Sequence, residues 1–202
     1  MRRVGLFIAL IVALATIGAP GEESFRFAIL GDRTGATRPG VYEQVWQETA
    51  AEDPALVVTA GDTIQGLDDT TAEAEWQQVR SILAPYQRYR LYLAPGNHDI
   101  WSERSQKLFL KYAAHPPHYG FDYEGAHFTV LDNSRSERFS PDELAFLESD
   151  LKAHAAQQVK FIVSHRPSWL LDAVVGNTRF PDRKSTRLNS SHLKLSRMPS
   201  SA

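Results

Sequence analysis

The stretch RLYLAPGNHD, residues 90–99, decides the fold class of this chain. Its first five residues are mostly apolar and predict a strand, and a proline–glycine turn then leads into Asn97, His98 and Asp99. A short strand that ends in a glycine turn with polar residues is typical of the strand–helix units of α/β proteins. We therefore expect a functional loop at the carboxyl end of this strand.

Three other apolar segments of the chain end in polar turns of the same kind. They are residues 25–30 before Asp32, residues 55–60 before Asp62, and residues 159–163 before His165. Polar loops at the carboxyl ends of neighbouring strands meet at one edge of an α/β sheet, where such proteins bind ligands. We therefore expect the four strands to belong to one sheet and the four loops to converge.

The remaining segments have helical or hairpin patterns. Ser140-Pro141-Asp142-Glu143 is a typical helix start, with serine as cap, proline in the first turn and glutamate three residues after the cap. Helices are predicted over residues 41–51, 72–83, 102–112 and 140–154, and a β-hairpin over residues 119–123 and 126–131. The sequence thus predicts an α/β domain.

The charge of the chain is uneven. Seven of its 22 bases but only one of its 24 acids lie outside residues 21–181, so that this central region carries a net charge of −8. Such an acidic body argues against a nucleic-acid partner and suits metal cations. The absence of cysteine excludes disulfides, thiolate zinc sites and cysteine nucleophiles.

The amino terminus has the pattern of a secretory signal. Met1-Arg2-Arg3 is a basic start, and residues 4–17 are an almost unbroken apolar run. The run is short for a membrane span, so we predict a signal peptide over residues 1–20 and export to the periplasm or the extracellular space. An uncleaved membrane anchor is the alternative.

The polar turns offer a set of metal ligands. Asp32, Asp62, Asn97 and His165 carry oxygen or nitrogen donors on separate strands, so folding could bring them to a pair of divalent cations. A carboxylate that bridges two cations reduces their repulsion, and a water between them can attack phosphorus in line. His98 follows Asn97 and can reach the phosphoryl group or the leaving oxygen.

Four motifs resemble those of the calcineurin-like metallophosphoesterases, in order and over residues 25–167: GDRTG at Gly31, GDTIQG at Gly61, GNHD at Gly96 and SHRP at Ser164. This resemblance implies a β-sandwich flanked by helices, a phosphate-ester substrate, and two metal ions such as Mn, Fe or Zn. It also implies that Asp32 binds the first metal, that Asp62 bridges both, that Asn97 and His165 bind the second, and that His98 is catalytic.

The chain departs from that family in two places. Thr34 stands where the family usually has a histidine, and Arg33 beside it is a candidate phosphate contact. The family's later GHxH motif is absent after His165, where the only histidine is His192. The chain as written is therefore expected to be inactive or poorly active. A catalytically impaired relative that binds metal or a phosphate ligand is the alternative function.

Other polar residues are expected to be structural. His115, His118 and His127 flank aromatic residues of the hairpin and are expected to be structural or surface residues. Asp99 either closes a turn or orients a histidine. A serine hydrolase or a dehydrogenase is disfavoured, because the chain has no G-x-S-x-G and no G-x-G-x-x-G motif.

The composition changes after Pro181. DRKSTRLNSSH, residues 182–192, matches codon by codon the translation of a common sequencing-adapter read, and SRMPSSA, residues 196–202, matches the same adapter. We expect a phosphoesterase domain over residues 24–181 that is truncated at its carboxyl end. We expect residues 182–202 to be an artefact without stable structure, and the native gene to continue into a GHxH segment.

Overall fold

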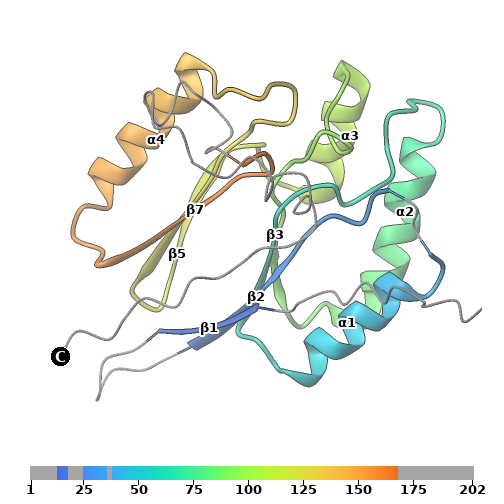
Figure 1. The fold of residues 1–202 in the computed structure, drawn as a ribbon, viewed down its shortest axis with the longest axis horizontal. Helices are drawn as coiled ribbons and strands as arrows, with labels where there is room; N and C mark the ends of the chain where they lie inside the picture. The colour runs from blue at the N-terminus through green and yellow to red at the C-terminus, as the bar shows by residue number, and fades with distance from the viewer. Residues whose placement is uncertain (1–12, 18–24, 36–37, 168–202) are drawn as a thin grey trace, which may run out of the picture.

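The computed structural model of the chain describes residues 13–17, 25–35 and 38–167 (Figure 1). Its strands form two sheets. The first has the order β1 (Ala13–Ile17), β2 (Phe25–Leu30), β3 (Leu56–Thr59) and β4 (Arg90–Tyr92), and the second has the order β5 (Tyr119–Tyr123), β6 (Ala126–Val130) and β7 (Val159–Val163). The helices are α1 (Val41–Ala51), α2 (Ala72–Leu83), the short 3₁₀ helix η1 (Ala84–Tyr86), α3 (Glu103–Ala113) and α4 (Pro141–Ala153).

The two sheets pack face to face as a sandwich. Phe27 of the first sheet packs against two rings of the second. Its ring centroid lies 5.2 Å from that of Phe128 and 5.1 Å from that of Phe161. Alternate residues of β2, β3, β5, β6 and β7 point into this aromatic layer, because side chains of a strand face opposite sides of the sheet in turn. Burying these rings on both inner faces is the main contact that holds the sheets together.

Helices cover both outer faces of the sandwich, as the layers in Figure 1 show from α4 on one side to α1 and α2 on the other. Trp46 of α1 is buried against Ala28 and Val57 of the first sheet. Trp76 of α2 packs against Phe109 of α3. The prediction of an α/β fold with central sheets flanked by helices is therefore confirmed.

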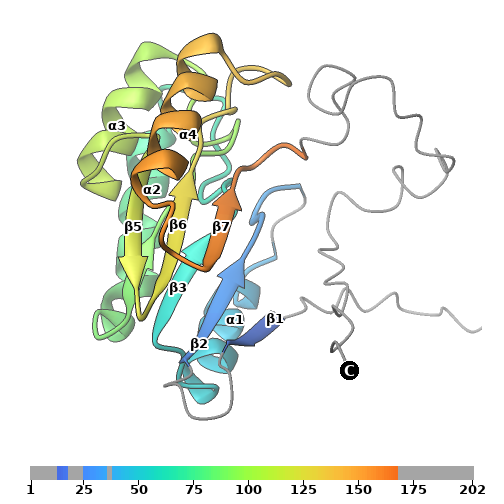
Figure 2. The same cartoon turned by 90° about the vertical axis from the view of Figure 1, so that its left-hand side faces the viewer.

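The expectation that all four site strands share one sheet is wrong. β2, β3 and β4 are parallel neighbours in the first sheet, but β7 pairs with β6 in the second sheet. In Figure 2, β2, β3 and β7 run in the same general direction, so their carboxyl ends reach the same end of the sandwich. Convergence therefore comes from the stacking of two sheets rather than from the edge of one.

The predicted helix start at Ser140 is confirmed. The Ser140 hydroxyl accepts a hydrogen bond of 3.1 Å from the Glu143 N–H, and Pro141 occupies the first turn of α4. α3 begins in the same way after Ser102, whose hydroxyl accepts a hydrogen bond of 3.0 Å from the Ser105 N–H. Both caps satisfy backbone donors that the first turn of a helix leaves without partners.

β1 lies within the segment predicted as a signal peptide and pairs antiparallel with β2. The signal peptide stays a prediction, and residues 182–202 lie outside the described residues. No helix in the described part of the chain has both the length and the apolar character needed to span a bilayer.

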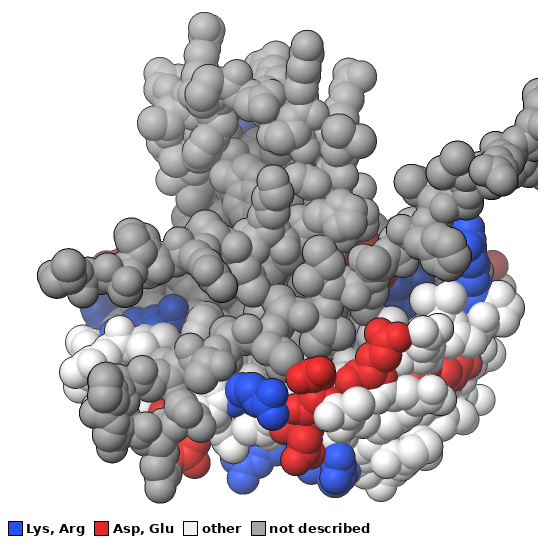
Figure 3. All heavy atoms as spheres, turned by 60° about the horizontal axis from the view of Figure 1, so that its bottom comes forward, with Lys and Arg blue, Asp and Glu red and all other residues white. Residues whose placement is uncertain are grey.

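On the face drawn in Figure 3, the described acidic and basic side chains lie next to one another.

Candidate active site

Two glycine turns bring the site loops into contact. A Cβ on Gly96 would lie 2.1 Å from Asp62 Oδ1 and 2.3 Å from the Asp62 N, distances that no side chain can occupy. Gly61 has a φ of 92°, and a Cβ there would lie 2.8 Å from His165 Nδ1. Glycine is therefore required at both positions by the close approach of the loops that follow β3, β4 and β7.

Asp99 holds these loops together through the backbone. Its carboxylate accepts hydrogen bonds from the N–H groups of Asp62, Thr63, Ile64 and Gly96 at 2.7 to 3.3 Å. The side chain is completely buried. Burial raises the pKa of Asp99 to about 7, and the hydrogen bond from Gly96 opposes this rise. Within the described residues Asp99 thus closes a turn and bonds to no histidine, which favours the first of the two expectations.

Asp62, Asn97 and His165 meet at the centre of the site. His165 Nε2 lies 3.0 Å from Asn97 Oδ1 and 3.4 Å from Asp62 Oδ1. His165 Nδ1 lies 2.9 Å from the Ala60 carbonyl oxygen, which accepts the proton of that nitrogen. In the neutral imidazole this leaves a lone pair on Nε2, which faces two oxygen acceptors. A cation among the three atoms satisfies all of them, so these residues fit a metal ion.

Asp32 and Thr34 lie on the other side of Asp62. The Thr34 hydroxyl donates to Asp32 Oδ1 at 2.5 Å and lies 3.3 Å from Asp62 Oδ2. Asp62 therefore has one carboxylate oxygen near His165 and the other near the Asp32 loop, which is the placement that a bridging ligand needs. The hydroxyl of Thr34 lies between two carboxylates, where a histidine would offer a stronger ligand.

The comparisons with known proteins agree with this geometry. A family model described as calcineurin-like phosphoesterase matches residues 25–195. The chain belongs to this family. The matched range includes residues 182–195, which the sequence analysis sets apart, and no described residue lies there.

A solved structure shows the same fold. The purple acid phosphatase PPD1 from seeds of yellow lupin (Lupinus luteus) superposes with a TM-score of 0.52 at 18% sequence identity, and the match covers 71% of this chain and 33% of that chain. This chain thus spans about a third of the length of the lupin phosphatase. None of the curated proteins matches the chain.

His98 of this member of the calcineurin-like phosphoesterase family stands beside the candidate metal ligands. Its backbone N–H donates to Asp62 Oδ1 at 2.9 Å, and its ring Nδ1 contacts the Gln65 carbonyl oxygen. The Gln65 side chain in turn donates to the Arg33 carbonyl oxygen at 2.9 Å. Sequence analysis did not single out Gln65, because a glutamine with a backbone role leaves no pattern in one sequence.

Arg33 of the phosphoesterase is held at the rim of the site. Its guanidinium lies 5.1 Å from the centre of the Tyr42 ring and 3.4 Å from Gln78 Oε1. Its backbone N–H donates to the Asp62 carbonyl oxygen at 3.0 Å. Burial raises the pKa of the Tyr42 phenol, so Tyr42 stays neutral beneath this cation.

Direct contacts join Asp62, Asn97, His98 and His165. Asp32 is linked to Asp62 through the Thr34 hydroxyl, and Arg33 through its backbone N–H. His115, His118 and His127 bond to other partners, namely Pro116, Glu143, Asp122 and Asp150.

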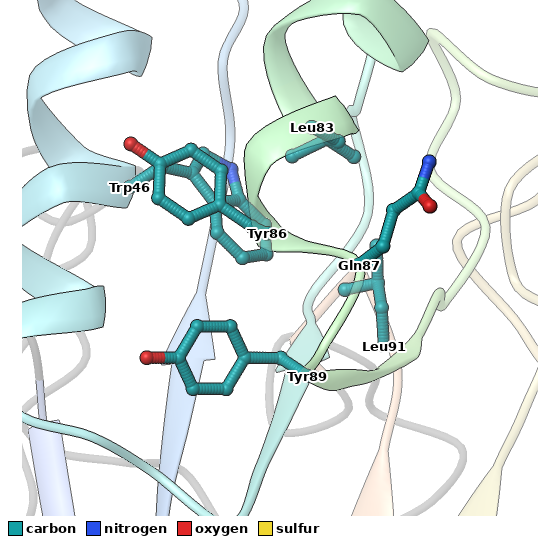
Figure 4. A pocket seen from close by; sticks show the side chains of 6 residues that line it. All are labelled: Trp46, Leu83, Tyr86, Gln87, Tyr89 and Leu91. Carbon is teal, nitrogen blue, oxygen red and sulfur yellow. The ribbon is translucent and has the colours of Figure 1, made fainter.

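A hollow of about 240 Å³ lies elsewhere on the phosphoesterase (Figure 4). Trp46 of α1 and Tyr86, Tyr89 and Leu91 around η1 and β4 line it. Tyr89 and Leu91 are at the amino end of β4, opposite the loop that carries Asn97. This hollow therefore belongs to the packing of α1 against η1 and takes no part in the candidate active site.

Proposed function

We propose that this protein is a metal-dependent hydrolase of phosphoric esters, either monoesters or diesters, with a dinuclear metal centre. The observation that carries the proposal is the position of Asp62. Its Oδ1 lies 3.4 Å from His165 Nε2 and its Oδ2 lies 3.3 Å from Thr34 Oγ1, so one carboxylate faces two separate ligand groups. Asn97 and His165 would hold one cation, Asp32 and Thr34 the other, and Asp62 both.

Two cations such as Mn, Fe or Zn, when bound, supply Lewis acidity toward the phosphoryl group and an activated water. The residues of the chain would hold these cations and orient the phosphate ester beside them. The Gln65 carbonyl oxygen accepts the Nδ1 proton of His98, so the ring as an imidazolium would also carry a proton on Nε2 for a phosphoryl or leaving-group oxygen. Arg33, whose backbone N–H bonds to Asp62, would add a charged contact to the phosphate if its side chain turned from Gln78.

A second candidate function is that of a catalytically impaired relative that binds metal or a phosphate ligand. Thr34 favours it, because its hydroxyl bonds to Asp32 at 2.5 Å and uses the carboxylate that the first metal needs. The written sequence also has no GHxH after His165. We therefore propose that this chain turns over poorly and that the complete gene, resequenced from genomic DNA across the Pro181 codon, encodes the active form.

The first prediction concerns Asp62→Asn. A neutral amide cannot hold two cations as a carboxylate does. We therefore expect the Mn²⁺ bound to this chain to fall by about one equivalent. Turnover of p-nitrophenyl phosphate by the complete gene product should fall roughly a thousandfold. Calorimetric titration and steady-state kinetics measure the two effects. Asp142→Asn, in the exposed first turn of α4, is the control. Unchanged metal binding and turnover would contradict the dinuclear centre.

The second prediction separates catalysis from metal binding. His98→Ala should lower turnover of the complete gene product by a factor of roughly 10² to 10⁴ and leave its metal content nearly intact, because the ring contacts Gln65 and lies beside the metal ligands. Metal analysis after gel filtration, together with kinetics, measures both quantities. Loss of a metal equivalent would make His98 a ligand instead.

Export is also proposed, from the basic start and apolar run at residues 1–17. Mass spectrometry of the mature amino terminus after cell fractionation tests it. A protein that keeps Met1 and stays inside the cell would contradict it.

A further inference from the structure

A second group of ligand-type side chains lies outside the candidate active site. Asp122 of β5 and His127 of β6 are directly paired across the hairpin, and His154 follows the last residue of α4. One ligand atom from each residue lies within 4.8 Å of the others. His127 pairs with Lys160 of β7, five residues before His165, which puts the group roughly 16 Å along the strand from the active-site end.

His127 is completely buried between two carboxylates. Its Nδ1 lies 2.7 Å from Asp122 Oδ1, and its Nε2 lies 2.8 Å from Asp150 Oδ2. Asp150 Oδ2 also accepts from the Thr129 hydroxyl at 2.6 Å. Gly120 makes room for this carboxylate, because a Cβ there would lie 2.7 Å from Asp150 Oδ1. The Nε2 side of His127 is thus fixed.

His154 is oriented in a similar way. Its Nδ1 lies 2.8 Å from the Asp150 carbonyl oxygen, which accepts the Nδ1 proton. This leaves a lone pair on Nε2, which is 3.9 Å from Asp122 Oδ2. Histidines that bind a metal commonly donate their other N–H to a carboxylate or a backbone carbonyl. Asp150 serves both histidines in this way, one through its carboxylate and the other through its carbonyl.

We propose that Asp122, His127 and His154 bind one divalent transition-metal ion of the zinc type, which clamps the end of α4 to the β5–β6 hairpin. Two imidazoles and one carboxylate suit Zn²⁺ and its neighbours rather than Mg²⁺ or Ca²⁺. The Asp122 side chain is 48% exposed, so water completes the coordination. This site is separate from the dinuclear centre and shares no residue with it.

Binding requires a small movement on the exposed side only. The rings of His127 and His154 are stacked, with centroids 3.7 Å apart and planes 12° apart, so their lone pairs lie in two nearly parallel planes. A shared ion needs these lone pairs to converge. The His154 side chain is 30% exposed at the end of α4 and can tilt, whereas His127 is held in place. Asp122, at the rim, can open to admit the ion.

The test uses the full chain with Asp62→Asn, which weakens the dinuclear centre and leaves this site unchanged. After removal of metal with EDTA, Zn²⁺ is titrated against a chromophoric chelator. We expect one equivalent of bound Zn²⁺ to be lost with His154→Gln, and the affinity of that equivalent to fall at least tenfold with Asp122→Asn. Glu124→Gln removes an exposed charge from the same hairpin and should leave the titration unchanged.

Thermal unfolding gives a second measurement. Zn²⁺ should raise the Tm of the background protein and of Glu124→Gln, and should raise it much less in His154→Gln, because binding to the folded state alone stabilises that state. Circular dichroism confirms that each variant is folded. If His154→Gln binds as much Zn²⁺ as the background, or if the background takes up none beyond the dinuclear centre, the cluster is a metal-free ion pair and the proposal is wrong. Neither result bears on the phosphoesterase proposal.

Discussion

Asp99 is the residue on which the site loops depend. Two carboxylate oxygens receive four backbone N–H groups, from three consecutive residues after Gly61 and from Gly96. No other side-chain type places two acceptor atoms at this distance from its backbone and offers no donor. Asp99 therefore fixes the position of Asp62 without touching its side chain.

Asp99→Asn tests this role. An asparagine keeps one acceptor but turns an NH₂ toward two backbone donors, so we expect the free energy of unfolding to fall by about 3 kcal/mol. Urea denaturation followed by circular dichroism measures the change. Glu148→Gln removes only an exposed ion pair with Lys152 and should change it by about 0.5 kcal/mol or less. Equal midpoints for the two variants would refute the role of Asp99.

In the turn that follows β4, the backbone at Gly96 determines how closely the site loops can approach one another. Gly96 lies against Asp62, and Gly61 lies against both Gly96 and His165. The loops are packed so closely that the backbone itself forms part of the site wall. The spacing of the candidate metal ligands around Asp62 is consequently set by two glycines, which have no side chain of their own to bind a metal.

Gly96→Ala should displace Asp62, because the new Cβ would lie 2.1 Å from its Oδ1. We expect a loss of about 2 to 3 kcal/mol in unfolding free energy and at least a tenfold weaker binding of Mn²⁺. Gly125→Ala is the matched control, because Gly125 has a φ of 78° and nothing within 4 Å of its Cβ position. It should lose about 1 kcal/mol through backbone strain and bind Mn²⁺ normally. Equal metal affinities would contradict the packing argument.

Local pattern predicted most elements and the grouping of the site residues. Strands 25–30, 119–123 and 159–163 and helices 41–51 and 72–83 have the predicted bounds, because apolar periodicity and glycine turns mark their ends. Periodicity does not say which strands pair, so the place of β7 in the second sheet was missed, and the sandwich itself was expected only from the family resemblance. The sequence pattern likewise did not predict that Asp122 pairs with His127 or that α4 docks beside them, because both contacts depend on the tertiary fold.

At the scale of the whole molecule, the two sheets share one aromatic core, so we expect the sandwich to unfold as a single unit. Phe128 is completely buried and contacts Phe27 of the first sheet and Phe161 of its own sheet, at centroid distances of 5.2 and 4.7 Å. Neither sheet has another large apolar partner for its inner face within the described residues. Each sheet therefore depends on the other for burial, and the site at their common end depends on both.

Phe128→Ala should lower the free energy of unfolding by about 3 to 5 kcal/mol, because it removes a buried ring and leaves a cavity between the sheets. Urea unfolding followed by both fluorescence and circular dichroism should still show a single transition. Leu144→Ala, on the exposed face of α4, should cost less than about 1 kcal/mol. Two separate transitions would show that the sheets unfold independently.

The distribution of the site over two sheets also sets an order of events during synthesis. His165 contacts Ala60, 105 residues earlier in the chain, and Asn97, 68 residues earlier. Contacts of such long sequence separation form late, since the intervening chain must be ordered before its ends can meet. A nascent chain that has placed Asp32, Asp62 and Asn97 still lacks the imidazole until β7 emerges and docks. The proposed metal centre would therefore be complete only late in folding, after translation has passed residue 165.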